Sequence, residues 1–418
     1  ASATAPRGLE SLRMSALEAA RSLTLPSRRD ADWRFTDLSA LYQLAFRAPA
    51  APAVPAPIAL AACEVAEAAH RLVFVDGVFA PALSAPHYDE SLMAMPLAAA
   101  LRAHGDAILP RLASLVPPDQ DAFSAINAAH LHDGAVVVAR AGAARPAPLH
   151  LLFVSTQAQA AVHPRVLIVA EPGAELTVIE DYSSLHDDLY CVNAVTEIIV
   201  AAGAGVRHVK LQRESTAAFH IATCAVHLDR DARFASHSVA LGARISRLNL
   251  NVVQSAPGAS MHVDGLAMLE GRQLADTHSF FDHAAPDGAS RQTHKAVLGG
   301  QSHGVFNGRI LVRPHAQRTD SAQQSRTLLL SQRAHVDSKP QLEIFADDVK
   351  CSHGATVGQL DADELFYLRS RGLSATAARN LLTYGFAAEI VDRIPVPSLV
   401  SRLHQWVLAR TEAGSRTE

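Results

Sequence analysis

Five short turns that resemble one another recur between residues 171 and 290 of this 418-residue chain. They read EPGAE, AAGAG, DRDAR, APGAS and PDGAS, and the stretches between them are short runs rich in Val, Ile and Leu. Successive turns lie 30, 28, 27 and 30 residues apart, counted between their third residues, which are Gly173, Gly203, Asp231, Gly258 and Gly288. A period of this size is typical of a chain that coils and stacks each coil on the one before.

The segments between the turns predict strands rather than helices. No helical stretch long enough for a βαβ crossover separates them, and alternate residues such as Val166, Ile168 and Ala170 are apolar. Glycine or aspartate at each turn would supply the left-handed backbone of a corner. We therefore predict a mainly β protein built on a parallel β-helix with the alternate apolar residues inside. An antiparallel sandwich, which has equally short strands, is the alternative that this pattern leaves open.

The pattern of apolar, polar and turn-forming residues divides the chain into three parts. Residues 1–133 predict an N-terminal helical region with a Pro/Ala-rich linker and a hairpin at Asp76-Gly77, a residue pair that tight hairpin turns favour. Residues 134–360 are assigned to the β-helix core. Residues 361–418 predict a C-terminal helical domain.

Helix boundaries are well marked in this last part. Asp361 and Ser374 are predicted N-caps, and Gly372 stands where the first helix would end. The last helix has an apolar stripe that is either a core face or a docking face for a partner. The stripe consists of Leu399, Leu403, Trp406 and Val407.

Composition and motif searches exclude several classes of function. A net charge of -4 argues against an extended phosphate-binding surface and hence against a nucleic-acid partner. There is no run of 18 apolar residues and no export signal, so we expect a cytoplasmic protein without a membrane partner. GxxxxGK[ST], GxGxxG and GxSxG motifs are absent, and we expect no enzyme activity.

Cysteine and histidine positions bear on metal binding. The closest two of the four cysteines are 33 positions apart, which excludes CxxC chemistry. Histidines gather late in the β-helix, and we expect most of them at the surface, with His294 as an inert example. The seven members are His278, His283, His294, His303, His315, His335 and His353.

The segment ADDVKCSHGATVG, residues 346–358, has the most distinctive chemistry. We expect the sequence from Lys339 to His353 to form one strand, with Asp347 and Asp348 as ordinary solvated residues. In an extended strand Cys351 and His353 lie on one face, within reach of one bound atom.

Thiolate and imidazole are both ligands for iron and zinc, and a histidinium beside the thiol of Cys351 would lower its pKa. Two ligands are too few to hold a metal ion, so other residues or another chain would have to complete the site. The residues by themselves leave open that Cys351 and His353 are an ordinary pair at a strand end.

Three segments together carry a family resemblance. They are DWRFTDL near the N-terminus, LVFVDGVFAPALS after the linker and KPQLEIFADDVKCSHGATVGQLDADELFYLRSRG at residues 339–372. With them the chain resembles the SufD family, components of the SUF system for iron-sulfur cluster assembly. The paralogous SufB proteins typically have an acidic EHEA-like segment in place of KCSHGA and a cysteine in place of Leu368, so the resemblance favours SufD.

The resemblance implies a right-handed β-helix flanked by helical regions, in a complex with SufB and the ABC-type ATPase SufC. SufB would pair through the edge of the β-helix, and SufC would dock on residues 361–418. A transient iron-sulfur cluster or iron would form at the SufB interface, with His353 as a candidate ligand and Cys351 as a weaker one. The isolated chain would hold no stable cofactor and could pair with itself. A purely structural subunit without ligands is the alternative.

Overall fold

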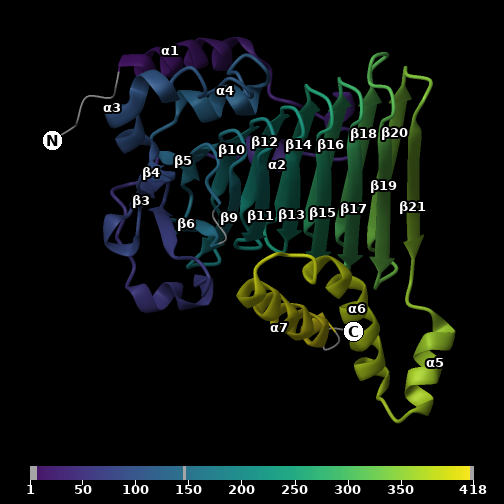
Figure 1. The fold of residues 1–418 in the computed structure, drawn as a ribbon. Coiled ribbons are helices and arrows are strands. Elements are labelled where there is room, and N and C mark those ends of the chain that lie inside the picture. The colour runs from purple at the N-terminus through teal and green to yellow at the C-terminus, as the bar shows by residue number, and fades with distance from the viewer. Residues whose placement is uncertain (1–6, 145–146, 415–418) are drawn as a thin grey trace.

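The computed structural model describes residues 7–144 and 147–414 and consists of two stacked sheets that the chain visits in turn (Figure 1). Together they form a parallel β-solenoid of about eight turns, and the protein is 42% strand and 23% helix. The first sheet contains, in spatial order, β2 (Val78–Phe79), β1 (His70–Val75), β6 (Leu149–Ser155), β9 (Glu175–Ser184), β11 (Gly205–Arg213), β13 (Arg233–Ala240), β15 (Ser260–Leu269), β17 (Ala289–Leu298), β19 (Asp320–Leu329) and β21 (Lys350–Gly358).

The second sheet lies opposite and supplies the other strand of each coil. In spatial order it contains β20 (His335–Ile344), β18 (His303–Val312), β16 (Leu274–His283), β14 (Ile245–Gln254), β12 (Phe219–Leu228), β10 (Cys191–Val200), β8 (Arg165–Ala170), β5 (Gly134–Ala139), β4 (Leu92–Pro96) and β3 (His87–Tyr88), with β7 (Ala161–Val162) beside β10. From β5 onward every neighbouring pair of strands is parallel, so the antiparallel sandwich is wrong.

The predicted corners adopt the left-handed backbone conformation, with one shift of position. Positive φ angles occur at four of the five predicted residues: Gly173, Gly203, Asp231 and Gly258. In the fifth turn the residue with positive φ is Asp287 (58°) and not Gly288. Gly288 is favoured for a different reason, because a Cβ there would lie 1.9 Å from the Oε1 atom of Gln254 and that buried side chain would have to shift.

The inward alternation is confirmed. Val166, Ile168 and Ala170 are completely buried in the main core cluster between the two sheets. The hairpin at Asp76-Gly77 is also present, since β1 pairs antiparallel with β2 and both turn residues have positive φ. Because β1 pairs in parallel with β6, the strands before residue 134 already belong to the solenoid.

The N-terminal helices cover the outer face of the second sheet at its first coils (Figure 1). They are α1 (Arg7–Ser22), α2 (Ser39–Tyr42), α3 (Leu97–Ile108) and α4 (Ala122–Ala129), with short 3-10 turns at Ala31–Trp33, Pro57–Cys63 and Pro81–Leu83. An ion pair that is completely buried fixes this layer to the solenoid. Arg165 donates to Glu197 at 2.9 Å and to Asn127 at 3.2 Å, while Glu197 accepts the backbone N–H groups of Ala113 and Leu115.

The C-terminal helices are α5 (Ala362–Ser370), α6 (Ala375–Val391) and α7 (Pro397–Gly414). Asp361 and Ser374 cap the first two as predicted, and Gly372 has a φ of 95°. The apolar stripe of α7 is a core face, because Leu399, Leu403 and Val407 are buried against the outer face of the first sheet. In contrast, α5 has no buried residue and projects away from the strands (Figure 1).

Among the described residues, no helix is both long enough and apolar enough to cross a membrane.

Candidate functional site

The solenoid ends without a cover at its last coil. β20 and β21 are the terminal strands of the two sheets, so each has one edge that pairs with no described strand. Large apolar side chains are exposed at this end: Ile344 is 40%, Phe345 62% and Val357 52% exposed. An open sheet edge with exposed apolar side chains is a surface on which further strands can add.

The segment from Lys339 to His353 is two strands, not the single strand predicted. β20 ends at Ile344, the chain turns, and β21 begins at Lys350 on the opposite sheet. Asp347 and Asp348 lie exposed in this turn, in agreement with their interpretation as solvated residues. The turn arises because a coil of the solenoid must cross from one sheet to the other at this point.

Cys351 and His353 lie on one face of β21, as their spacing predicts, and the register with β19 shows that this face is the inner one. Cys351 is in register with Ser321 and His353 with Gln323, and both of these β19 residues point into the solenoid, where each is only 1% exposed. Side chains in register on parallel strands point to the same face. His353 is nevertheless exposed, because no further coil covers it.

The environment of Cys351 differs from the one expected. The residue is half-buried and packs against the main core cluster. This burial raises the pKa of the Cys351 thiol and outweighs a hydrogen bond from the backbone of Ser321. The prediction that a neighbouring histidinium lowers this pKa is therefore wrong, and a raised pKa leaves less of the thiol as reactive thiolate at neutral pH.

A row of polar side chains inside the solenoid leads to His353. The Oγ atom of Ser279 lies within hydrogen-bond distance of the Gln292 side-chain amide, and Gln323 donates to Oε1 of Gln292 at 2.8 Å. The Oε1 atom of Gln323 is buried and has no hydrogen-bond partner among the described residues. Since His353 follows Gln323 in register, this unpaired acceptor lies at the open end.

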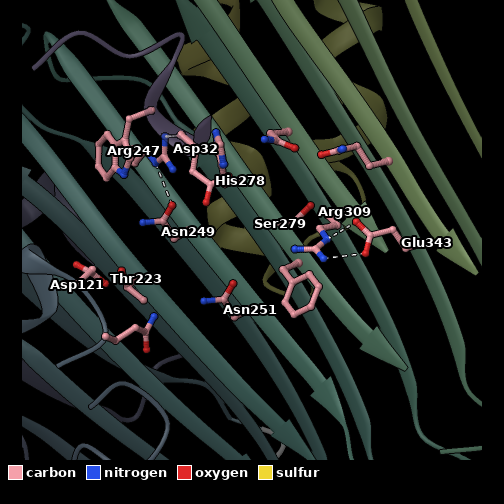
Figure 2. A pocket seen from close by; sticks show the side chains of 15 residues that line it. Asp32, Asp121, Thr223, Arg247, Asn249, Asn251, His278, Ser279, Arg309 and Glu343 are labelled. Carbon is pink, nitrogen blue, oxygen red and sulfur yellow. Dashed lines mark hydrogen bonds and ion pairs between the residues drawn. The ribbon is translucent and has the colours of Figure 1, made fainter. Parts of the chain in front are cut away.

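A polar hollow on the outer face of the second sheet is the other candidate (Figure 2). It has a volume of about 590 Å³. Its main charged groups are already paired: Arg247 contacts Asp276 at 2.6 Å and stacks over Trp33, and Arg309 makes two 2.8 Å hydrogen bonds to Glu343. Because these groups satisfy one another, the hollow offers less free binding capacity than the open end.

Sequence reasoning missed a buried ionic network inside the solenoid. Glu180 accepts hydrogen bonds from Thr196, Tyr182 and His208 at 2.8–2.9 Å, and Lys210 lies 4.0 Å away. Burial by itself raises the pKa of Glu180, but the His208 hydrogen bond and the nearby positive charges outweigh it and hold this pKa at about 2. The sequence did contain a signal for this network, because the alternation of apolar residues places the charged Glu180 on the inner face of its strand.

The late histidines are less uniform than expected. His315, His335 and His353 are exposed, whereas His283 and His294 are buried inside the solenoid. His294 stacks on Phe306 with 4.9 Å between ring centroids. The interpretation of His294 as an inert surface residue is therefore wrong.

These features define a class of protein: a parallel β-solenoid whose open end, and not an enclosed pocket, carries the candidate ligands. Comparison with known sequences identifies the family. Residues 153–386 match the model of the SUF system FeS cluster assembly SufBD core domain, and residues 2–150 match the SufBD protein N-terminal region. The chain belongs to the SufBD family of iron-sulfur cluster assembly proteins.

Two relatives illustrate this relationship. The chain is 40% identical to an iron-sulfur cluster assembly SufBD family protein of Synechocystis sp. over 96% of its length and 90% of the relative. It is 34% identical to the iron-sulfur cluster assembly protein SufD of Escherichia coli K12 over 94% of its length and 90% of that protein. These names describe assembly proteins and no catalytic activity.

Proposed function

We propose that this chain is the SufD-type scaffold subunit of an iron-sulfur cluster assembly complex and that its open end pairs with the paralogue SufB. The uncovered last coil is the observation that supports this most strongly. β20 and β21 offer two free strand edges beside exposed Ile344, Phe345 and Val357. A paralogue with the same end could add its strands to both sheets, which would pair the free backbone groups and bury the apolar side chains.

Within that junction, His353 is the candidate ligand for a nascent cluster or for iron, both of which are cargo of the complex. Its side chain is exposed on the inner side of β21, so a partner that covers the coil would enclose it. SufB would supply further ligands, because this chain by itself offers too few to hold a metal ion or cluster. Cys351 is a weaker candidate because it is half-buried and burial raises the pKa of its thiol.

The C-terminal region offers a separate surface for the ATPase SufC. On α5, Phe366 is 74% and Tyr367 57% exposed, and the helix contributes no residue to any core. Exposed aromatic side chains are frequent anchors of protein–protein interfaces. The family relationship supports this assignment and a role in iron acquisition.

The free state of all four cysteines fits a reducing compartment such as the cytoplasm.

Replacing His353 tests the proposed role. His353→Ala should leave the complex assembled, because removing one imidazole from an exposed strand end costs about 1 kcal/mol or less. It should strongly reduce iron and acid-labile sulfide per complex, because an incomplete ligand set loses a member. The measurement is iron and sulfide content of the co-purified complex, with subunit stoichiometry determined by size exclusion. Cys351→Ala should have a milder effect.

The control is His315→Ala, an exposed histidine in the same region. His294→Ala is unsuitable, because it would leave a cavity beside Phe306. A normal cluster yield from His353→Ala would favour the alternative of a purely structural subunit. An equal loss from His315→Ala would show general damage to the fold.

A further inference from the structure

A second group of metal-ligating side chains lies on the outer face of the second sheet, at the start of its last two strands. His303 begins β18 and His335 begins β20, and the two residues are in register. Asp337 follows His335 by two positions, so the alternation of β20 places both side chains on the same face. The histidines are 32 residues apart in sequence and come together because the solenoid makes one turn between them.

The three side chains converge closely. The ring centroids of His303 and His335 are 4.0 Å apart with an interplanar angle of 21°, and Nε2 of His303 lies 2.8 Å from Oδ2 of Asp337. One nitrogen from each histidine and one carboxylate oxygen all lie within 4.8 Å of one another. Among the described residues, this is the one group of three or more His, Cys, Asp or Glu side chains that meets this condition.

We propose that His303, His335 and Asp337 form a binding site for a divalent transition-metal ion of the iron and zinc class. Two imidazoles and one carboxylate are a ligand set for Zn²⁺ and Fe²⁺, whereas Mg²⁺ and Ca²⁺ prefer oxygen ligands throughout. With metal–ligand bonds of about 2.0–2.2 Å, neighbouring ligand atoms lie roughly 3.0–3.6 Å apart. Small side-chain rotations would bring the three donors to that spacing.

Two similar arrangements among the described residues do not bring three ligand atoms this close together. The rings of His70 and His87 also lie 4.0 Å apart, but the carboxylate beside them, Asp89, accepts hydrogen bonds from Ser91 and Leu92. Both bonds go to Oδ1, while Oδ2 lies 2.7 Å from Nε2 of His87, and this group does not meet the 4.8 Å condition that His303, His335 and Asp337 meet. The Asp337 carboxylate has His303 as its one hydrogen-bond partner in the part of the chain that the structure describes.

The second arrangement has only one histidine. His278 pairs with Asp276 at 3.1 Å, and this carboxylate is held by Arg247 and Thr36. His278 lies on the same outer face as the proposed site, one strand before β18. It therefore provides a matched control for His335.

The proposed site keeps open coordination positions. His335 is exposed and the Asp337 side chain is 36% exposed, so a bound ion would complete its coordination with water or with a group from another molecule. Such an ion can exchange, unlike one in a closed structural site. The site is separate from His353, which lies on the inner side of β21 in the other sheet. It therefore goes beyond the function proposed above.

Cobalt binding tests this site on the complete, tag-free chain. Co²⁺ is a coloured probe for zinc-type and iron-type sites, and its visible absorption should saturate at one ion per chain and disappear when Zn²⁺ is added. Asp337→Asn and His335→Ala should each weaken binding about tenfold or more, because each removes one of three ligands. His278→Ala and His315→Ala should bind Co²⁺ as the parent chain does.

Melting curves complete the test. In the parent chain, saturating Co²⁺ should raise the melting temperature, because an ion bound across β18 and β20 stabilises only the folded state. Asp337→Asn is nearly isosteric and should melt like the parent without metal while losing this increase. The proposal fails if the chain gives no saturable Co²⁺ spectrum, or if His278→Ala or His315→Ala weakens binding as much as His335→Ala.

Discussion

At the scale of single residues, buried histidines make the stability of the folded chain depend on pH. Burial inside the fold lowers the pKa of His237, His283 and His294 to about 4 each, although a carboxylate lies near every one of them. In the folded chain these imidazoles are therefore neutral at pH 5. In the unfolded chain they have the ordinary pKa of about 6.5 and would be charged at that pH.

The first prediction concerns acid sensitivity. Since the pKa is depressed in the folded state, the unfolded state binds more protons between about pH 6.5 and 4. The free energy of unfolding is therefore complete above pH 6.5 and falls with decreasing pH, by up to about 1.4 kcal/mol per pH unit for each of the three histidines. Urea unfolding followed by circular dichroism at pH 7.5, 6.0 and 5.0 measures this slope.

His294→Gln supplies the check on this assignment. It removes one titrating group, so its slope between pH 6.5 and 5 should be smaller than that of the parent, even if its stability at pH 7.5 is lower. His315→Ala, an exposed histidine, should keep the parent slope. A urea midpoint that does not change between pH 7.5 and 5.0 would contradict the prediction.

Among the secondary-structure elements, the three C-terminal helices differ in what they contact. α6 and α7 cover the outer face of the first sheet, where Ile390, Leu399 and Leu403 pack against β11, β13 and β15. Deleting residues 361–418 as a test of the proposed ATPase docking would therefore expose a core and destabilise the solenoid. α5 has no such role, so changes restricted to it can separate binding from folding.

At this scale we predict that Phe366→Ala and Tyr367→Ala lower the affinity for the ATPase SufC and leave the melting temperature unchanged. Aromatic anchors at interfaces contribute about 2 kcal/mol or more to the binding free energy, so losing one raises the dissociation constant roughly thirtyfold. Tyr88→Ala is the matched control, because Tyr88 is 58% exposed on β3 and Tyr367 is 57% exposed. Calorimetric titration of each variant with the ATPase measures the effect. Unchanged affinity in both α5 variants would exclude α5 as the docking helix.

For the whole molecule, the two ends of the solenoid differ. At the first coils, the β1–β2 hairpin, β3 and β4 extend the sheets, and the N-terminal helices cover part of their outer face. The end strands there, β2 and β3, have two residues each, whereas β20 and β21 at the last coil have 10 and 9 residues and each has one edge that pairs with no described strand. Growth or pairing of the stack is therefore expected at the last coil, where the unpaired edges are long.

The prediction for the whole molecule is that Val357→Lys abolishes pairing with SufB. Val357 is 52% exposed on β21, and a charge there would have to be buried if another chain covered this end. Val54→Lys, which changes an equally exposed valine before the solenoid, should pair normally. Co-purification with SufB and size exclusion of the isolated chain at increasing concentration measure pairing with the paralogue and with itself. Equal behaviour of the two variants would mean that another surface makes the contact.

The sequence by itself determined the features that depend on short-range rules. Alternation with a period of two placed Val166, Ile168 and Ala170 inside, and turn chemistry identified four of the five corner residues. The caps at Asp361 and Ser374 and the shared face of Cys351 and His353 are local in the same sense.

The tertiary structure decided which residues meet across coils and which are covered. His303 and His335 are adjacent, and His294 is buried, because of the register between coils. The spacing of the turns varies from 27 to 30 residues, so the sequence alone does not predict that register. Likewise, Cys351 and His353 sit on one face of one strand, but His353 is exposed because the stack ends there. Alternation and turn chemistry act within a few residues, whereas burial depends on whether another layer follows.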